Sequence, residues 1–188
     1  MKTFLLPLAT AASLSLSLLH GADSAGYFDL GQFTPPKSGG TFVEVNLKGN
    51  LLSMAAKIAA KEEPEAAELI RSIESIRINV IGLDDANRAE IKGRVDSVRT
   101  GLNAAGWERV VTVQEDGNDV GVYTKTKDAD SISGVVVTVL SQDGEAVFVN
   151  VVGDIKPERL AELGEHLHLD PLKAVKKAAK EDAAETKK

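Results

Sequence analysis

The chain has no cysteine in its 188 residues. This absence excludes structural disulfides, thiolate metal sites and cysteine nucleophiles. It also excludes membrane attachment through the acylated cysteine of a lipoprotein. Aromatic residues make up only 4% of the sequence, and Trp107 is the only tryptophan. Without disulfides the fold must be held by its hydrophobic core, and the chain is long enough to bury one.

An excess of basic charge is also missing. Lys and Arg total 22 against 28 Asp and Glu, which gives a formal net charge of −6, and the basic residues are scattered apart from the C-terminal end. Because a nucleic-acid groove needs clustered cations, this distribution argues against nucleic acid as a partner.

The sequence lacks the linear motifs of several enzyme classes. It has no G-x-x-x-x-G-K-[ST] phosphate loop, no G-x-G-x-x-G after a strand and no G-x-S-x-G nucleophile elbow. The acidic pairs Glu62-Glu63 and Asp84-Asp85 fall where a solvated helix end and a helix cap are expected. We therefore favour a non-catalytic protein. A hydrolase-type site assembled from distant carboxylates and a histidine stays the alternative, since such a site leaves no linear motif.

Metal-binding patterns are incomplete. His166 and His168 lie two positions apart in an expected helix and point in different directions. The loop that starts at Asp116 has a glycine in its sixth position, as a calcium loop does. It places Val120 in the fifth position and Lys127 in the twelfth, where a bidentate glutamate is required. We expect no bound metal and no cofactor.

Residues 1–22 have the order of a secretory signal peptide. A lysine precedes the uncharged apolar run Phe4–Leu19, and small residues follow. Cleavage is expected after Ala22, Ser24 or Ala25. The sequence predicts an exported protein, periplasmic or extracellular, with no stable membrane span once the signal is removed.

The rest of the chain divides into three parts by composition. Residues 23–40 contain a Pro-Pro pair and a Gly-Gly pair and are predicted to be a linker or an N-terminal arm. Residues 41–170 have the patterns of a single domain. Residues 171–188 are rich in Lys and Ala with few apolar anchors, which is typical of a solvated, fraying tail.

Apolar periodicity predicts four helices in the domain. The first should bury a face formed by Leu47, Leu51, Ala55 and Ile58. The second begins at Pro64 and should bury Ala66, Leu69, Ile70 and Ile73. The third follows Asp84 and Asp85, ends at Gly106 and carries the stripe Ile91, Val95, Val98 and Leu102. The last should bury Leu160, Leu163 and Leu167.

Strand patterns surround these helices. Short runs begin at Thr41 and Ile76, and four more follow Gly106 with turn signals between them, which favours antiparallel hairpins. The expected fold class is α+β, with a mixed, largely antiparallel sheet of five or six strands and helices packed on it.

The last strand is expected to end in a structural corner. Gly153 would allow a sharp turn, and Asp154 would cap the following helix.

Trp107 and Tyr123 form the candidate ligand-binding pair. Trp107 follows the glycine that ends the long helix, and Tyr123 lies on a strand expected nearby. Such a pair either lines a ligand pocket or packs at the rim of the core. No catalytic residue is indicated.

Several segments together resemble a known family. They are VEVNLKGNLLSMAAKIA, IESIRINVIGL, GWERVVTV, VGVYTKT, ISGVVVTVL and VFVNVVGDIKPERLAELGEHL. Over Thr41 to Leu169 the chain resembles the uncharacterised bacterial secreted family called domain of unknown function 4252. The resemblance implies an exported bacterial envelope protein. It brings no agreed activity, cofactor or catalytic residue.

These observations favour an exported, non-catalytic binding or protein-interaction module, with an unknown protein or small molecule as its partner. A regulatory partner of an envelope signalling system, served by the solvated tail, is a further alternative.

Overall fold

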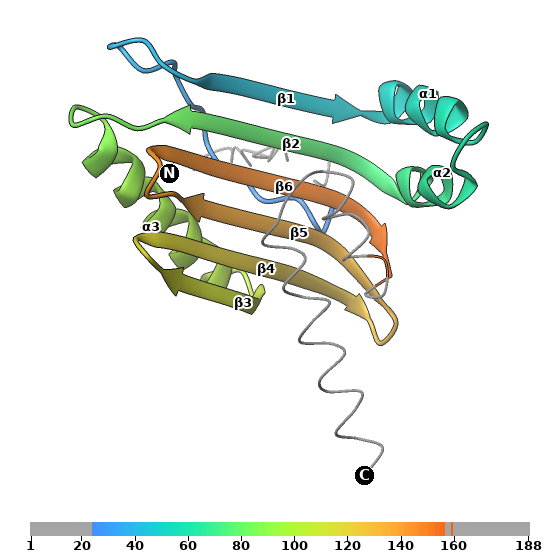
Figure 1. Cartoon of the computed structure of the whole chain (residues 1–188). Helices are drawn as coiled ribbons and strands as arrows, with labels where there is room; N and C mark the ends of the chain where they lie inside the picture. Colours follow the sequence, from blue (N-terminus) through green and yellow to red (C-terminus); the bar gives the residue numbers. More distant parts are fainter. Residues whose placement is uncertain (1–23, 157–158, 160–188) are drawn as a thin grey trace, which may run out of the picture.

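A computed structural model describes residues 24–156 and Arg159. Six strands form an open sheet in the order β1-β2-β6-β5-β4-β3, and every neighbouring pair is antiparallel. The strands are β1 (Phe42–Lys48), β2 (Ile73–Gly82), β3 (Glu108–Glu115), β4 (Asn118–Asp128), β5 (Ser131–Leu140) and β6 (Glu145–Ile155). The helices are α1 (Gly49–Ala59), α2 (Pro64–Arg71) and α3 (Arg88–Ala104). The α+β prediction is confirmed (Figure 1).

One face of the sheet carries α3 and the N-terminal arm, which we define as residues 24–33. Alternate strand residues point to this arm face, as the period of two requires. They form a core with the arm residue Leu30 and the four predicted stripe residues of α3, all of which are buried. The members of this core are Leu30, Ile81, Ile91, Val95, Val98, Leu102, Trp107, Tyr123, Val136, Ala146 and Phe148.

The opposite face carries a second core built mainly from valines of β4, β5 and β6 and isoleucines of β2. Val122, Val137 and Val149 are fully buried in it. Leu52 of α1 and Leu69 of α2 join this core from the helix pair at one end of the sheet (Figure 1). The final predicted helix, with Leu160, Leu163 and Leu167, lies outside the described residues.

The buried face of α1 was predicted wrongly. Leu52 and Ala56 are its buried residues, whereas Leu51 and Ile58 are 54% and 66% exposed. The reason is that α1 packs against α2, and Leu52 of α1 joins the same core as Leu69 of α2. Tertiary packing therefore determines which face of α1 is buried.

The predicted corner at Gly153 and Asp154 is also wrong, because both residues lie within β6. Gly153 pairs with Ile73 at a bulge in β2, and the Asp154 amide donates to the Ser72 carbonyl at 2.9 Å. The Asp154 carboxylate accepts from the Lys127 ammonium at 2.7 Å. This hydrogen bond lowers the pKa of Asp154 and raises the pKa of Lys127. Asp154 thus serves a strand-to-strand ion pair.

Candidate functional site

The arm crosses the arm face as an extended segment whose main chain is bound by side chains of the domain. Buried Asn150 of β6 accepts the Phe28 amide at 3.0 Å and donates to the Gly26 carbonyl at 3.1 Å. Arg77 of β2 donates to the Gly31 carbonyl at 2.6 Å, and Arg94 of α3 donates to the Gln32 carbonyl at 3.2 Å. These contacts hold the arm whatever its side chains are.

Three arm side chains enter the core. The Phe28 ring meets Trp107 edge to face, with centroids 6.2 Å apart and planes at 81°. Leu30 is 1% exposed. The Phe33 ring packs on Phe148 of β6 at 4.7 Å between centroids, and the Arg94 guanidinium lies 5.5 Å from the Phe33 centroid. The arm is therefore an integral layer of the fold.

The first anchor of the arm is a backbone-to-backbone contact between Gly26 and β5. A Cβ added to Gly26 would lie 1.6 Å from the Ser133 carbonyl oxygen. A Cβ added to Gly134 would lie 2.3 Å from the Gly26 carbonyl oxygen. Real Cβ atoms do not approach so closely, so the docked arm requires glycine at both positions.

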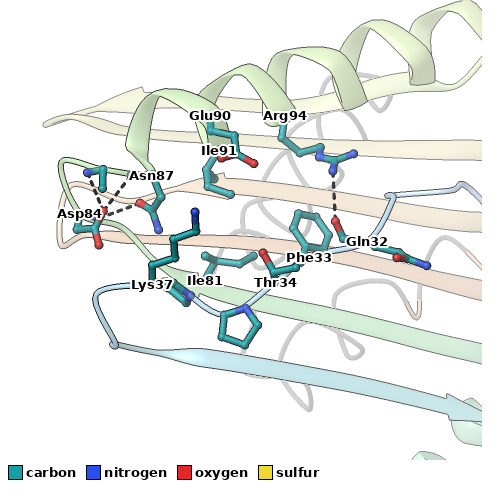
Figure 2. A pocket seen from close by; sticks show the side chains of 13 residues that line it. Gln32, Phe33, Thr34, Lys37, Ile81, Asp84, Asn87, Glu90, Ile91 and Arg94 are labelled. Atoms are coloured by element: carbon teal, nitrogen blue, oxygen red, sulfur yellow. Dashed lines mark hydrogen bonds between the residues drawn. The ribbon is translucent and has the colours of Figure 1, made fainter.

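A cavity of about 260 Å³ lies between the C-terminal end of the arm, the loop that follows it and the start of α3 (Figure 2). Its apolar wall includes Phe33, Ile81 of β2 and Ile91 of α3. Its charged lining residues are Lys37, Asp84, Glu90 and Arg94. The cavity thus combines an apolar surface with charges of both signs.

Two of the four charges are already engaged by the protein. The Asp84 carboxylate accepts the Ser38 hydroxyl and the amides of Ala86 and Asn87. These hydrogen bonds, with that from Ser38 the largest, lower the pKa of Asp84 and keep it charged. This arrangement also explains how the chain enters α3: Asp84 closes the preceding turn, and the helix begins at Arg88. Arg94 is held by Gln32 and Phe33.

The other two charges are free to meet a ligand. Lys37 and Glu90 are exposed, and neither makes an ion pair or a side-chain hydrogen bond within the described part of the chain. Figure 2 shows the Lys37 side chain extending from the loop toward α3, where Glu90 and Ile91 lie. An ammonium and a carboxylate at one apolar cavity suit a small ligand that itself carries both charges.

The structure places both predicted ligand-binding residues in the arm-face core. Trp107 is 5% exposed and Tyr123 is fully buried, and neither lines the cavity beside α3. The Tyr123 hydroxyl is buried without a hydrogen-bond partner among the described residues. Their role in ligand binding stays a prediction. His166 and His168 lie outside the described residues.

The sequence model of one family, described as a domain of unknown function, matches residues 38–163, which is more than half of the chain. The chain belongs to the domain of unknown function 4252 family. Neither a curated protein nor a solved structure matches the chain. The part of the chain that matches the 4252 family begins at residue 38, in the loop that follows the arm. The cavity wall formed by β2 and α3 therefore lies within the matched residues, whereas the wall formed by the arm and its loop comes largely from residues before residue 38.

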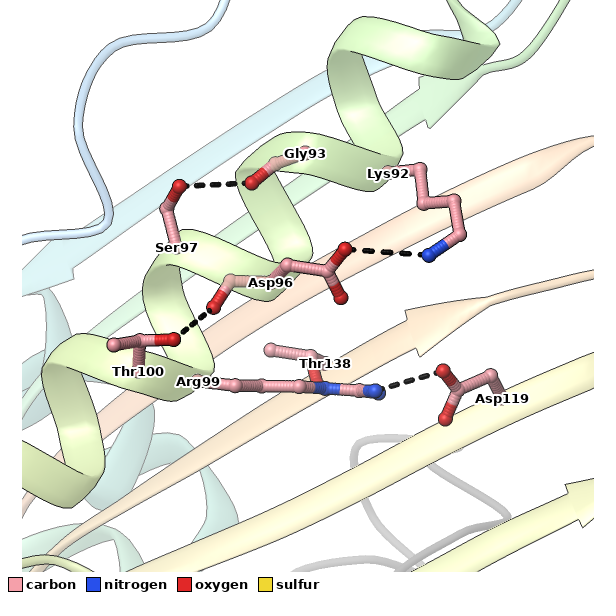
Figure 3. A network of polar contacts seen from close by, with 8 residues as sticks. All are labelled: Lys92, Gly93, Asp96, Ser97, Arg99, Thr100, Asp119 and Thr138. Atoms are coloured by element: carbon pink, nitrogen blue, oxygen red, sulfur yellow. Dashed lines mark hydrogen bonds and ion pairs between the residues drawn. The ribbon is translucent and has the colours of Figure 1, made fainter.

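A polar network fixes α3 on the sheet (Figure 3). The Arg99 guanidinium donates to the Asp119 carboxylate of β4 at 2.7 Å and to the Thr138 hydroxyl of β5 at 3.1 Å. The hydrogen bond from Arg99 lowers the pKa of Asp119, so the carboxylate stays charged over the physiological range. The network is a helix-to-sheet clamp that holds one wall of the cavity in place.

Sequence reasoning missed the residues that build the site. Lys37 lies in the loop after the arm, whereas Glu90 and Arg94 both lie on α3, and no local motif marks them. The buried polar residue Asn150 offers a signal in the sequence. It interrupts an otherwise apolar strand, which is unusual at a central sheet position. Residues 24–156 and 159 contain no cluster of three or more metal-ligating side chains and no helix long and apolar enough to cross a bilayer.

Proposed function

We propose that this protein is an exported, non-catalytic binding module that holds a small zwitterionic ligand in the cavity between the arm and α3. One observation carries the proposal: Lys37 and Glu90 present unpaired opposite charges at a cavity whose wall is formed by Phe33, Ile81 and Ile91. Both side chains are exposed, so a ligand in the cavity could reach their charges.

The chemistry of the cavity defines the class of ligand. A carboxylate of the ligand would pair with Lys37, an ammonium would pair with Glu90, and an apolar side chain would cover Phe33 and Ile91. A cavity of about 260 Å³ is near the lower end of the range for ligand pockets, about 300–1,000 Å³. An apolar amino acid or dipeptide fits this description better than a larger ligand.

Export is the second part of the proposal. It is supported by residues 1–22, which have the charged start, the apolar run and the small residues of a secretory signal. A binding module outside the cytoplasm meets the amino acids and short peptides that the cavity suits.

The proposal predicts that the dipeptide Leu-Leu binds and that its doubly blocked form, N-acetylated and amidated, binds far more weakly. Lys37→Met and Glu90→Gln should each weaken Leu-Leu binding by a factor of about 1.4 to 5, since an exposed ion pair is worth about 0.2–1 kcal/mol. Isothermal titration calorimetry measures both effects.

Lys61→Met is the matched control, because Lys61 is an exposed lysine in the turn after α1 and does not line the cavity. Equal affinity for the free and the blocked dipeptide, or equal weakening by Lys37→Met and Lys61→Met, would contradict the proposed site.

A further inference from the structure

The arm lies in a groove that recognises an extended segment mainly by its main chain. Asn150, Arg77 and Arg94 bind three carbonyls and one amide of the arm, and none of them binds an arm side chain by a hydrogen bond. Side-chain selection rests on Gly26 against Gly134, an aromatic residue against Trp107, a buried leucine, and a second aromatic residue against Phe148. The groove therefore fits any copy of residues 24–33, in whichever molecule that copy resides.

The segment that follows the arm, residues 34–40, is suited to act as a hinge. Residues 34–40 form no helix or strand, and they contain two prolines and two consecutive glycines. Gly39 and Gly40 have positive φ values of 81° and 110°, and a Cβ added at either would meet nothing within 4 Å. The backbone at these glycines can therefore change direction without disturbing the core. Seven residues span up to about 25 Å when extended.

Docking the arm also has an energetic cost on the sheet. Asn79 of β2 is fully buried, and both polar atoms of its side chain lack a hydrogen-bond partner among the described residues. Alternation along β2 places Asn79 between Arg77 and Ile81 on the arm face. An amide that is buried without hydrogen-bond partners costs free energy, so the closed arm face is less favourable than its apolar contacts alone indicate.

We propose that the groove exchanges its own arm for the arm of a second copy of this chain. The contacts are identical in the two arrangements, and reciprocal exchange gives a closed two-fold dimer with no new surface required. A short linker holds the arm at an effective concentration of about 1 mM, so exchange competes with self-docking only when copies are concentrated. This inference stands apart from the proposed ligand, because it rests on the arm groove and not on the charges of the cavity.

Two complementary variants of the full chain test the exchange. Gly26→Val gives a chain whose arm is defective and whose groove is intact, because the added atoms collide with the Ser133 carbonyl. Gly134→Val gives a chain whose groove is defective and whose arm is intact, because the added atoms collide with Gly26. The second variant also carries Trp107→Phe, so that the single tryptophan in a mixture reports only the groove of the first.

Alone, the Gly26→Val chain should be monomeric, with its Trp107 emission shifted to the red because Phe28 no longer covers the indole. Mixed one to one with the groove-defective chain, it should form a heterodimer in sedimentation velocity, and the emission should return to the wild-type wavelength. The same total concentration of Gly26→Val alone is the control and should show neither change.

The proposal is overturned if the mixture stays monomeric with unchanged emission at about 1 mM of each chain, the concentration that the linker supplies in cis. It is also overturned if Gly26→Val alone keeps the wild-type emission, since the arm would then dock without its first anchor. If Gly134→Val lacks a cooperative melt, Asn150→Ala replaces it as the groove-defective partner, because it removes two bonds to the arm and introduces no clash.

Discussion

At the scale of the single residue, Gly153 shows how a contact between distant segments determines an amino acid. Its place after an apolar run suggests a turn, yet the structure keeps it inside β6. A Cβ at position 153 would lie 2.3 Å from the Ser72 carbonyl oxygen and 2.8 Å from the Ile73 Cα. Glycine is needed here because two backbones approach each other at the β2 bulge. That cause depends on a residue about 80 positions away, so local sequence does not reveal it.

Gly153→Ala is expected to lower the free energy of unfolding by about 1–3 kcal/mol, the usual cost of forcing an extra carbon into a packed region. Gly93→Ala is the matched control. Gly93 lies exposed inside α3 with open space around its Cβ position, so alanine there should stabilise the protein by about 0.5–1 kcal/mol. Urea denaturation measures both. Effects of the same sign and size would contradict the close approach at Gly153.

At the scale of the element, the clamp between α3 and the sheet should make stability depend on pH. The pKa of Asp119 is lowered in the folded state by Arg99, and the unfolded value is about 3.9. Because the pKa of Asp119 is lower in the folded state, the unfolded state binds more protons than the folded state as the pH falls. The stabilisation is therefore fully present above about pH 4 and is lost as the pH falls through the folded pKa.

Asp119→Asn keeps the size of the side chain and removes its charge. We expect the wild type to be more stable than this variant by about 1 kcal/mol at pH 7, since both partners are mostly buried and the hydrogen bond is charge-assisted. The difference should shrink below about pH 4. Unfolding free energies measured from pH 7 to pH 3 give the comparison, and a difference that is constant over this range would show that the Asp119 charge does not contribute.

The elements also show which parts of the fold could be predicted. The stripe Ile91, Val95, Val98 and Leu102 was predicted and is buried, because a long amphipathic helix on a sheet has one possible inward face. Ile73 was expected in a helix and instead begins β2, because β6 extends far enough to pair with it. Strand alternation predicted the sheet class well, since it depends on near neighbours alone.

At the scale of the whole molecule, the candidate site depends on three segments that the sequence keeps apart. The loop supplies Lys37, the end of β2 supplies Ile81, and α3 supplies Glu90. Residues 23–40 were expected to be a linker or an arm, and composition alone did not indicate that Phe28, Leu30 and Phe33 would pack on the sheet. Three apolar residues spaced irregularly in a Pro- and Gly-rich segment give no periodic signal. The site could not be predicted because the arm that builds it has no secondary structure of its own.

In the proposed function, the arm and α3 together form the ligand site. The most direct test is hydrogen exchange at the Phe28 amide, measured with and without Leu-Leu. This amide donates to the Asn150 side chain, so it exchanges when the arm lifts from the sheet. A ligand held between the arm and α3 must leave before the arm lifts. Exchange at Phe28 should then slow about tenfold at a dipeptide concentration ten times its dissociation constant. Unchanged exchange at Phe28 with the dipeptide bound would contradict the account.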